Sequence, residues 1–321
     1  MPRRTGVYLL PMGEKLSRVP SVTAALVAVL LTGVVSVVSA SPASATTRRA
    51  APPTATYTVS SFNVLGASHT PPGSSRASGS TRIVWAKQLL DQHHVDVAGF
   101  QELQAVQATK FLSITAGKWA LYPGLEISRG TENSIGWRTD VFDLVDSATV
   151  RIPYFNGNPR PMPVVLLREK SSGLMAYFAN FHNPADTATY RNQGKWRIEA
   201  TRIEAALQNQ LRPLGIPRFM TGDMNERDAY FCRITKAAPV KAARGGYWRN
   251  NVCYANKPRA VDWIFGSAAL KFSNYLEDRG PLVDKTTDHP VLVSDVTVDS
   301  ALYPNATAIE PPPHLVPAVN Y

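Results

Sequence analysis

The sequence predicts an α/β protein with mixed β-sheets. Short apolar segments with strand character recur along the chain, and segments with helical spacing lie between several of them. No internal repeat is visible in the sequence. Many strands with intervening helices in one compact length are typical of a single α/β domain. We place this domain at residues 56–300.

The first half of the domain alternates between strands and helices. Residues 56–64 alternate in polarity like a strand, and a Gly/Ser/Pro loop follows at 71–79. Residues 82–93 have helical spacing, and 95–102 form a short apolar strand that ends in two polar residues. Helical spacing resumes at 103–112.

The second half contains the clearest helix, at residues 190–211. Its apolar stripe follows the helical repeat and consists of Trp196, Ala200, Ile203, Leu207 and Leu211. Strand-like segments lie on both sides of this helix. They are 132–138, 141–152, 162–170, 175–182, 216–223, 260–267, 270–276 and 289–298.

Residues 1–45 have the pattern of a secretory signal peptide. Basic residues precede an uncharged apolar run at 22–40, and small-residue cleavage patterns follow it. Met12 is an alternative start, and an uncleaved anchor is the competing interpretation, since such a run can just span a bilayer. The cleavage patterns favour a secreted protein without stable membrane insertion. We expect a disordered leader at 46–55 and a Pro-rich, extended tail at 301–321.

The charge and the cysteines agree with export. Loss of the signal peptide removes four basic residues and one acidic residue, so the formal net charge falls from +10 to +7. This charge is consistent with a polyanionic partner, and the simpler interpretation is a soluble basic surface. In an exported protein Cys232 and Cys253 are expected to form a disulfide that stabilises the fold by about 3 kcal/mol. We expect a monomer.

Several strands begin or end at a carboxylate, an amide or an imidazole. Each of these residues alone has an ordinary explanation, such as a turn amide or a solvated strand end. Buried ionisable groups cost several kcal/mol unless they are paired or metal-bound, so a set of them needs a common reason. Strand ends that meet at one edge of a sheet supply it. The set is Asn63, Gln101, Glu102, Asn180, His182, Asp223, Asn225, Asp262, Asp288 and His289.

This set fits metal-assisted hydrolysis of a phosphoester. Carboxylates such as Glu102 and Asp288 suit Mg²⁺, with Mn²⁺ or Ca²⁺ as alternatives. Asp223 and Asn225 are two residues apart and are expected to point to the same side of a strand. One can take a proton from water while the other orients that water or a phosphate oxygen. His289, paired with a carboxylate, can be held as a cation against developing negative charge.

The ordered motifs FNV, FQE, NFHNP, GDMN, VDWIF and TDHPVLV resemble those of the endonuclease/exonuclease/phosphatase superfamily. This superfamily includes DNase I-like nucleases, abasic-site endonucleases, neutral sphingomyelinases and inositol polyphosphate 5-phosphatases. The resemblance covers roughly residues 56–299. It implies a four-layer α/β sandwich of the DNase I type, in which helices flank two central mixed β-sheets and the site lies at one rim.

The resemblance also implies roles for the strand-end residues. Glu102 is expected to be the principal metal ligand, with Asn63 and Asp288 beside it. Asp223 is expected to polarise the attacking water, and Asn225 to bind that water or the phosphate.

The two histidines have separate implied roles. His289 is expected to contact the phosphate, oriented by Asp262. His182 matches a catalytic histidine of the nuclease and sphingomyelinase branches, near the leaving group. In those nucleases a carboxylate partners this histidine, and here Glu132 or Asn133 occupies the corresponding region.

The segment 233–259 joins two of the motifs and is expected to overhang the site. It holds seven basic residues and no acidic one, with three aromatic residues between them, which are Tyr247, Trp248 and Tyr254. Basic and aromatic side chains together favour a nucleic-acid surface. An equally weighted alternative is a disulfide-closed surface loop. We expect Asn180, Arg244, Arg249 and Lys257 to bind substrate.

Three functions follow from these patterns. An exported divalent-metal nuclease is favoured by the charge, the basic segment and His182. The alternative is a sphingomyelinase-like or inositol-phosphate-type phosphodiesterase or phosphatase, although no exposed aromatic hairpin stands out in the sequence to support action at a membrane. A non-catalytic binding protein is disfavoured, because the central acidic and amide residues are intact.

Overall fold

The computed structural model describes residues 51–321. The expected signal peptide at 1–45, and the leader as far as residue 50, lie outside the described residues. Within the part of the chain that is described, no helix combines the length and the apolar character needed to cross a bilayer.

The first central sheet has six strands, of which β1 and β2 run parallel and the other neighbours run antiparallel. In order across the sheet they are β13 (Lys271–Asp278), β14 (Val291–Asp299), β1 (Thr54–Asn63), β2 (Val97–Gln101), β4 (Ile135–Arg138) and β3 (Trp119–Tyr122). Strand β1 begins two residues before the expected strand, because Thr54 and Ala55 already pair with β14.

The second central sheet also has six strands and contains a parallel pair, β7 and β8. In order across the sheet they are β5 (Phe142–Pro153), β6 (Pro159–Glu169), β7 (Met175–His182), β8 (Arg218–Asp223), β12 (Asp262–Ser267) and β9 (Val240–Ala242). A separate two-stranded hairpin consists of β10 (Tyr247–Arg249) and β11 (Val252–Tyr254).

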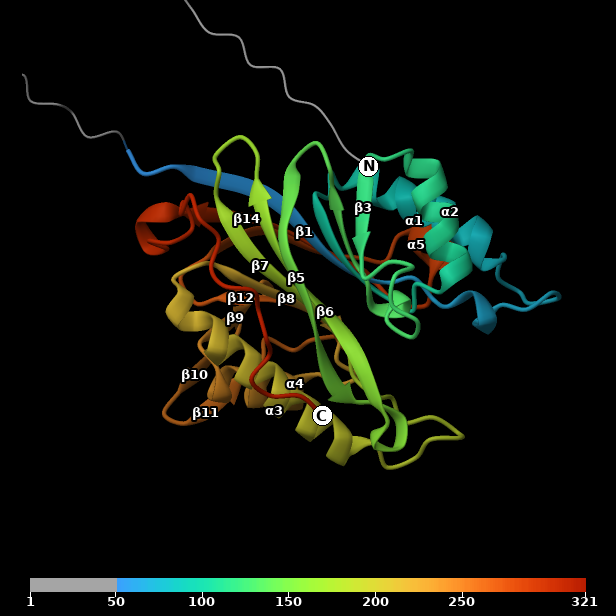
Figure 1. Cartoon of the computed structure of the whole chain (residues 1–321). Coiled ribbons are helices and arrows are strands. Elements are labelled where there is room, and N and C mark those ends of the chain that lie inside the picture. Colours follow the sequence, from blue (N-terminus) through green and yellow to red (C-terminus); the bar gives the residue numbers. More distant parts are fainter. Residues whose placement is uncertain (1–50) are drawn as a thin grey trace, which may run out of the picture. The chain divides into compact units, whose positions relative to one another are not determined.

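Helices cover the outer face of each sheet (Figure 1). Those on the first sheet are α1 (Gly79–Gln92), α2 (Ala105–Thr115) and α5 (Pro281–Thr286), and those on the second are α3 (Gly194–Leu211) and α4 (Asp228–Ala237). Between the sheets, side chains such as Val59, Phe178 and Phe219 are almost completely buried. The four-layer DNase I-like sandwich implied by the family resemblance is therefore confirmed.

Helix α3 carries most of the predicted apolar stripe. Ala200, Ile203 and Leu207 are buried against the second sheet, whereas Trp196 is half-buried near one end. The expected start at residue 190 is wrong. Asn192 has a left-handed φ of +59°, which a helix cannot contain. Helix α3 therefore begins after it, at Gly194.

The segment 233–259 was expected to be one surface loop, but it has regular secondary structure. It contains the end of α4, the edge strand β9 and the β10–β11 hairpin. Helix α4 forms because Tyr230, Phe231 and Ile234 share one buried face. The strands were missed because each has only three residues, too few to show alternation.

The C-terminal tail has no strand or helix after Leu302, as expected, but it packs on the domain. The N–H of Met175 donates to Ala306 O at 2.7 Å, and the N–H of Leu315 donates to an Asp146 carboxylate oxygen at 2.9 Å. Ala306 and Leu315 are buried. The tail is therefore part of the folded unit.

Candidate active site

Strand pairing brings the predicted residues to one rim of the two sheets. The parallel strands β1 and β2 end side by side at Asn63 and Gln101, and β7 and β8 end side by side at His182 and Asp223. Strand β12 runs in the opposite direction, so its first residue, Asp262, lies opposite Asp223. The carboxyl ends of the parallel strands therefore meet at one edge, where α/β proteins place their sites.

Glu102 occupies a strained backbone position directly after β2, with a φ of +59°. Its Oε1 accepts from the Asn63 amide and its Oε2 from the Gly66 N–H, both at 2.9 Å, and His69 Nε2 lies 3.4 Å from Oε2. Burial alone would raise the pKa of Glu102, but the field of His182 and these hydrogen bonds lower it below its usual value. The carboxylate is therefore ionised at neutral pH.

Asn63 bridges two carboxylates. Its Nδ2 donates to Glu102 and, at 3.2 Å, to Asp223 Oδ2, while its Oδ1 accepts from the Leu65 N–H at 3.0 Å. In this arrangement the amide oxygen is directed away from Glu102. Asn63 sets the spacing of Glu102 and Asp223, and its expected role as a metal ligand stays a prediction.

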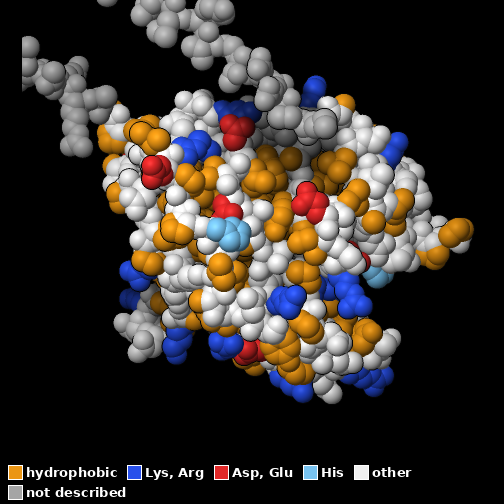
Figure 2. Space-filling model, viewed as in Figure 1, with side chains coloured by type: hydrophobic (Ala, Val, Ile, Leu, Met, Phe, Trp, Pro, Cys, Tyr) orange, Lys and Arg blue, Asp and Glu red, His pale blue; other side chains and the backbone are white. Residues whose placement is uncertain are grey.

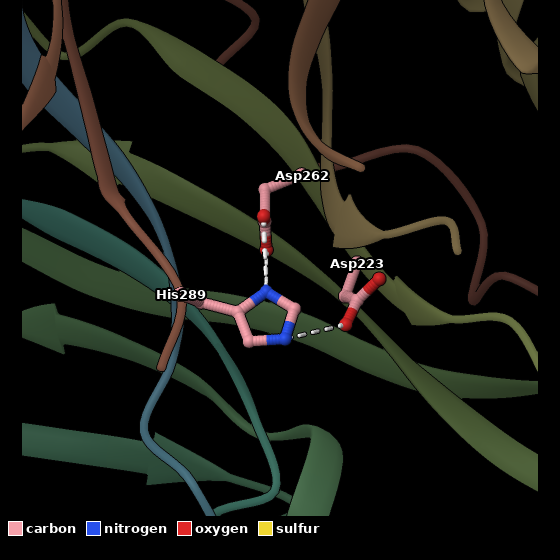
Figure 3. A group of neighbouring side chains, drawn as sticks. All are labelled: Asp223, Asp262 and His289. Atoms are coloured by element: carbon pink, nitrogen blue, oxygen red, sulfur yellow. Dashed lines mark hydrogen bonds and ion pairs between the residues drawn. The ribbon is translucent and has the colours of Figure 1, made fainter. Parts of the chain in front are cut away.

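Asp262, His289 and Asp223 form a row of charges (Figure 3). His289 Nδ1 lies 3.0 Å from both Asp262 oxygens, and its Nε2 lies 3.6 Å from Asp223 Oδ2. Burial works against the charged imidazole, but the two carboxylates outweigh it and raise the pKa of His289 to about 10. Burial also raises the pKa of Asp262 to about 6.

The three groups lie close enough together to suggest a metal site. We assign them instead to an imidazole held between two carboxylates, because both ring nitrogens already face a carboxylate oxygen, Nδ1 at 3.0 Å and Nε2 at 3.6 Å. The predicted pairing of His289 with Asp262 is present.

Asp223 and Asn225 lie together, but not for the reason expected. Strand β8 ends at Asp223, so the alternation of a strand does not apply to Asn225. Instead, Asn225 has a left-handed φ of +50°, and its N–H donates to Asp223 Oδ1 at 2.9 Å, as in an Asx turn. The Asn225 side chain is fixed by Asn183 O at 2.8 Å.

His182 faces the Glu102–Asp223 side of the site. Its Nε2 lies 3.7 Å from Asp223 Oδ2, and its Nδ1 lies 3.4 Å from the Tyr154 hydroxyl. Burial raises the pKa of Tyr154, so its hydroxyl stays neutral. Tyr154 therefore takes the position expected for a carboxylate partner, and Glu132 forms an ion pair with Arg160 instead.

A cavity of about 290 Å³ opens in front of Glu102 and His182. Tyr154 and Phe155, which directly follow β5, line one side of it, and the Arg160 guanidinium lies 4.3 Å from the centre of the Tyr154 ring. None of these three residues was predicted. The one sequence signal was the aromatic pair Tyr154 and Phe155, close after the predicted strand at 141–152.

Glu102 is the residue that best fits a divalent metal. It combines an ionised carboxylate with access to the cavity, and hard oxygen donors with room for water are what Mg²⁺ prefers. Asp288 is exposed, and within the described chain its one hydrogen bond comes from Thr287 Oγ1 at 3.5 Å. No hydrogen bond or ion pair in the described chain joins Asp288 to Glu102. The expected place of Asp288 in the metal site therefore stays a prediction.

Two buried arginines fix the loops around the rim. Arg82 donates to Val64 O at 2.7 Å and Thr286 O at 3.0 Å, which joins the loop after β1 to the end of α5. Arg197 donates to Pro184 O at 2.8 Å and lies 3.5 Å from a Glu226 oxygen, which joins the loops after β7 and β8. Neither arginine was predicted to be important.

Asn180 was expected to bind substrate, and this expectation is wrong. Its side chain is completely buried between the sheets. The amide nitrogen donates to Phe100 O at 2.6 Å and Asn133 O at 2.8 Å, and the amide oxygen accepts from Gln101 at 2.7 Å. Asn180 joins the two sheets just below the rim and has no access to a ligand.

Arg244 is also not a free substrate-binding cation. It forms a 2.5 Å ion pair with Glu277 and lies between the rings of Trp263 and Tyr275. Arg249 and Lys257 are exposed, on or next to the β10–β11 hairpin rather than at the rim. The disulfide between Cys232 and Cys253 is confirmed, and it joins α4 to β11.

The model of the Endonuclease/Exonuclease/phosphatase family matches residues 60–289, which includes every residue of the rim. The chain belongs to this family. Members of the endonuclease/exonuclease/phosphatase family are phosphoester hydrolases, and the fold described above is theirs. A search of curated protein sequences finds no match.

Solved structures of the endonuclease/exonuclease/phosphatase family share the fold. A mannosyl-6-phosphatase of Bacteroides thetaiotaomicron is 17% identical, with a TM-score of 0.56 over 75% of this chain and 99% of that chain. The catalytic domain of human nocturnin with bound sulfate is 18% identical (TM-score 0.58; 76% and 97% covered). TDP2 of D. rerio in complex with a single-strand DNA product is 16% identical (TM-score 0.53; 75% and 98% covered). At these identities the likeness concerns the fold alone.

Proposed function

We propose that this protein is a secreted, divalent-metal-dependent phosphodiesterase that cleaves nucleic acid. The observation that carries the proposal is the placement of two histidines about one carboxylate. His182 and His289 both approach Asp223 Oδ2, at 3.7 and 3.6 Å. His182 can therefore protonate the leaving oxygen while His289 stabilises the negative charge of the phosphate.

The residues of the chain have distinct roles in this reaction. Asp223 accepts a proton from water as the water oxygen bonds to phosphorus, and Asn225 orients that water. His289, kept charged by Asp262, stabilises the negative charge that develops on the phosphate. As the ester P–O bond breaks, His182 donates a proton to the leaving oxygen.

The metal site in this proposal is Glu102, with Asn63 holding its carboxylate in place. A bound Mg²⁺, or Mn²⁺ or Ca²⁺ in its place, supplies a positive charge that polarises the scissile phosphate. Glu102 accepts hydrogen bonds only from neutral groups of the described chain, apart from its contact with His69. Its charge is therefore available to a cation.

The charges around the site favour a diester over a monoester. Across residues 51–321, no Lys or Arg contacts Glu102, Asp223 or Asp262. Arg160 is the one such side chain in the cavity lining described here, and Glu132 already neutralises it. A dianionic monoester needs more cationic partners than a monoanionic diester. The basic chain and the structural neighbour solved with a single-strand DNA product support nucleic acid as the substrate.

A sugar-phosphate or lipid phosphoester is the second candidate. The cavity of about 290 Å³ is small and has charged groups such as Glu102 and Arg160 beside Tyr154 and Phe155, and one structural neighbour is a mannosyl-6-phosphatase. The pattern of residues 1–45 supports secretion in either case.

The test compares substrates under controlled metal. The mature protein is assayed with Mg²⁺, Mn²⁺ or Ca²⁺, and with EDTA, on single- and double-stranded DNA, RNA, bis(p-nitrophenyl) phosphate, mannose 6-phosphate and sphingomyelin. We expect metal-dependent cleavage of nucleic acid and of the small diester. Preference for the monoester or the lipid would overturn the nuclease assignment, and hydrolysis of none would overturn the enzymatic one.

A further inference from the structure

The β10–β11 hairpin has one attached face and one free face. Successive residues of a strand point to opposite sides. Trp248 and Cys253 pair across the hairpin and face α4. The neighbouring pairs face away from α4 and are exposed, with exposed fractions of 57% for Tyr247, 43% for Tyr254 and 51% for Val252, beside the exposed Arg249.

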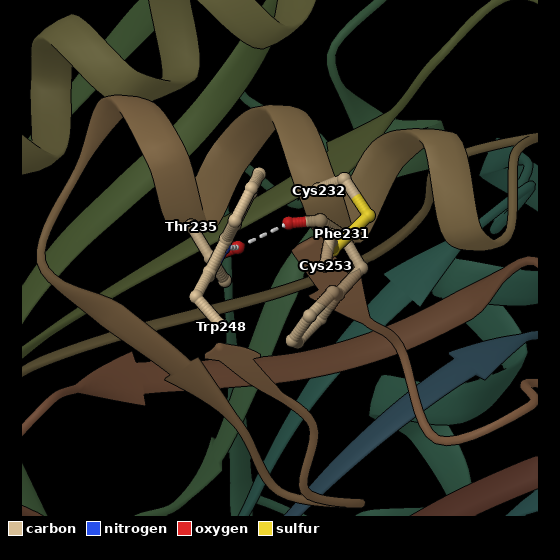
Figure 4. Close-up of a disulfide and its surroundings, with 5 residues drawn as sticks. All are labelled: Phe231, Cys232, Thr235, Trp248 and Cys253. Carbon is tan, nitrogen blue, oxygen red and sulfur yellow. Dashed lines mark hydrogen bonds between the residues drawn. A yellow bond between two sulfur atoms is a disulfide. The ribbon is translucent and has the colours of Figure 1, made fainter. Parts of the chain in front are cut away.

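The attached face holds the hairpin in a fixed position (Figure 4). The Cys232–Cys253 disulfide ties β11 to α4, and Trp248 Nε1 donates to Thr235 Oγ1 at 2.9 Å. A fixed surface loses little conformational entropy when it binds a ligand. The disulfide therefore serves to present the free face rather than to close a flexible loop.

The free face carries an aromatic platform. The rings of Tyr247 and Tyr254 stack with their centres 4.8 Å apart and their planes 17° apart. The turn beyond them is polar, because Asn250 and Asn251 both have left-handed φ angles and form a two-residue hairpin turn. The β10–β11 hairpin is an exposed aromatic hairpin that the sequence did not reveal. Burying the two turn amides in a bilayer would nevertheless be costly, which favours nucleic acid over a lipid surface as its partner.

Positive charge surrounds the platform. Arg249 and Lys257 are exposed and form no ion pair with any residue from 51 to 321. Figure 2 shows lysine and arginine side chains spread over the face in view, with several along its lower part. A cavity of about 540 Å³ lies beside the platform, and its lining includes Tyr247, Tyr254 and Lys257 together with one acidic residue, Asp228 at the start of α4.

We propose that the free face of the β10–β11 hairpin binds a single-stranded stretch of nucleic acid that extends from the active site. Bases stack on Tyr247 and Tyr254, and Arg249 and Lys257 neutralise phosphates, since stacking with cations is how proteins hold single strands. This inference rests on the proposed action on nucleic acid.

The hairpin is within reach of the active site along the chain. The segment 255–261 leads directly from Tyr254 to Asp262. At about 3.5 Å per residue, their Cα atoms are at most about 28 Å apart. This distance corresponds to about eight nucleotides at a rise of about 3.4 Å each.

Binding without turnover provides the test. In an Asp223→Asn background, the affinity for a fluorescent oligothymidylate of twelve nucleotides is measured by anisotropy at several salt concentrations. We expect Tyr247→Ala with Tyr254→Ala to weaken binding by about tenfold or more. Arg249→Ala with Lys257→Ala should reduce the salt slope by about 1.4, at about 0.7 per phosphate contact. Lys110→Ala with Lys271→Ala removes two exposed charges elsewhere and is the matched control.

The outcomes distinguish an effect of the hairpin on binding from an effect on the hydrolytic step. In otherwise unaltered protein, the hairpin variants should hydrolyse bis(p-nitrophenyl) phosphate at the parent rate. Equal oligonucleotide affinity in the parent and both hairpin variants overturns the proposal, as does a parent that does not bind. The tyrosine variant could instead lose binding to sphingomyelin vesicles and keep its affinity for the oligonucleotide. That result would assign the free face to lipid and would also overturn the proposal. DNA cleavage by the unaltered protein decides the proposed function separately.

Discussion

The rim of the candidate active site and the β10–β11 hairpin differ in how deeply they bury their side chains. At the rim, Asp223 and Asp262 are 2% and 1% exposed, and their oxygens are bound by neighbouring side chains. On the hairpin, Tyr247 is 57% exposed. Burial with fixed partners shifts pKa values and orients groups for chemistry, whereas exposure provides area for contact. Substitutions at the rim should therefore change turnover, and substitutions on the hairpin should change binding.

The largest effect is expected for Asp223→Asn. Removal of the group that accepts the proton from water should lower kcat by about 10³-fold or more. The amide has nearly the same shape, so the circular dichroism spectrum should be unchanged. Steady-state hydrolysis of a small phosphodiester measures this, with the exposed Asp284→Asn as the control. Activity within tenfold of the parent would contradict the assignment.

The next effect is expected for Asp262→Asn, which should lower kcat by about 10²-fold and change the pH profile. In the parent the pKa of His289 is raised from 6.5 to about 10, so the imidazole keeps its positive charge through neutral pH and loses it as the pH rises through about 10. Without Asp262, the imidazole should lose its proton at a lower pH. The alkaline limb of the pH–rate profile should therefore move to lower pH, and an unmoved limb would show that Asp262 does not hold the charge.

Asn180→Ala tests the boundary between the rim and the interior. The substitution leaves Phe100 O and Asn133 O without donors, at about 1–3 kcal/mol for each buried group. We expect urea unfolding to show a loss of about 2–4 kcal/mol, with an unchanged KM. A raised KM without a loss of stability would restore Asn180 to the substrate site.

The smallest effect distinguishes two arginines of the same segment. Arg244→Met should lower the free energy of unfolding by about 1–3 kcal/mol, because Glu277 loses its half-buried partner. Arg249→Ala should change it by less than about 0.5 kcal/mol, since its side chain is exposed. Thermal unfolding of both variants measures the difference, and equal stabilities would contradict the distinction between structural and binding cations.

The sequence was sufficient for the fold class and for most of the rim. Periodicity located the strands, and polar residues at strand ends marked Glu102, His182, Asp223, Asp262 and His289. It failed where depth decides the role. Asn180 and His182 lie two residues apart on β7 and share a face, but Asn180 is bonded to Phe100 O of the first sheet, whereas His182 lines the cavity.

Long-range partners were also invisible. Nothing near Arg244 indicates that Glu277, on a distant strand, neutralises it. Tyr154 follows β5 and reaches His182 only because the second sheet brings β7 close to that strand end. The hairpin escaped detection because its strands are short and its turn is Asn-Asn, whereas Asn-Gly is the usual signal.

The central claim is that Asp223 directs water to a phosphodiester phosphorus with the help of a metal at Glu102. Hydrolysis of a short oligonucleotide by the mature protein in ¹⁸O-labelled water with Mg²⁺, followed by mass spectrometry of the products, tests it directly. The account predicts that the label enters the phosphate product, that EDTA abolishes its incorporation, and that Asp223→Asn does the same. Label in the alcohol product, or incorporation that persists with EDTA, would contradict it.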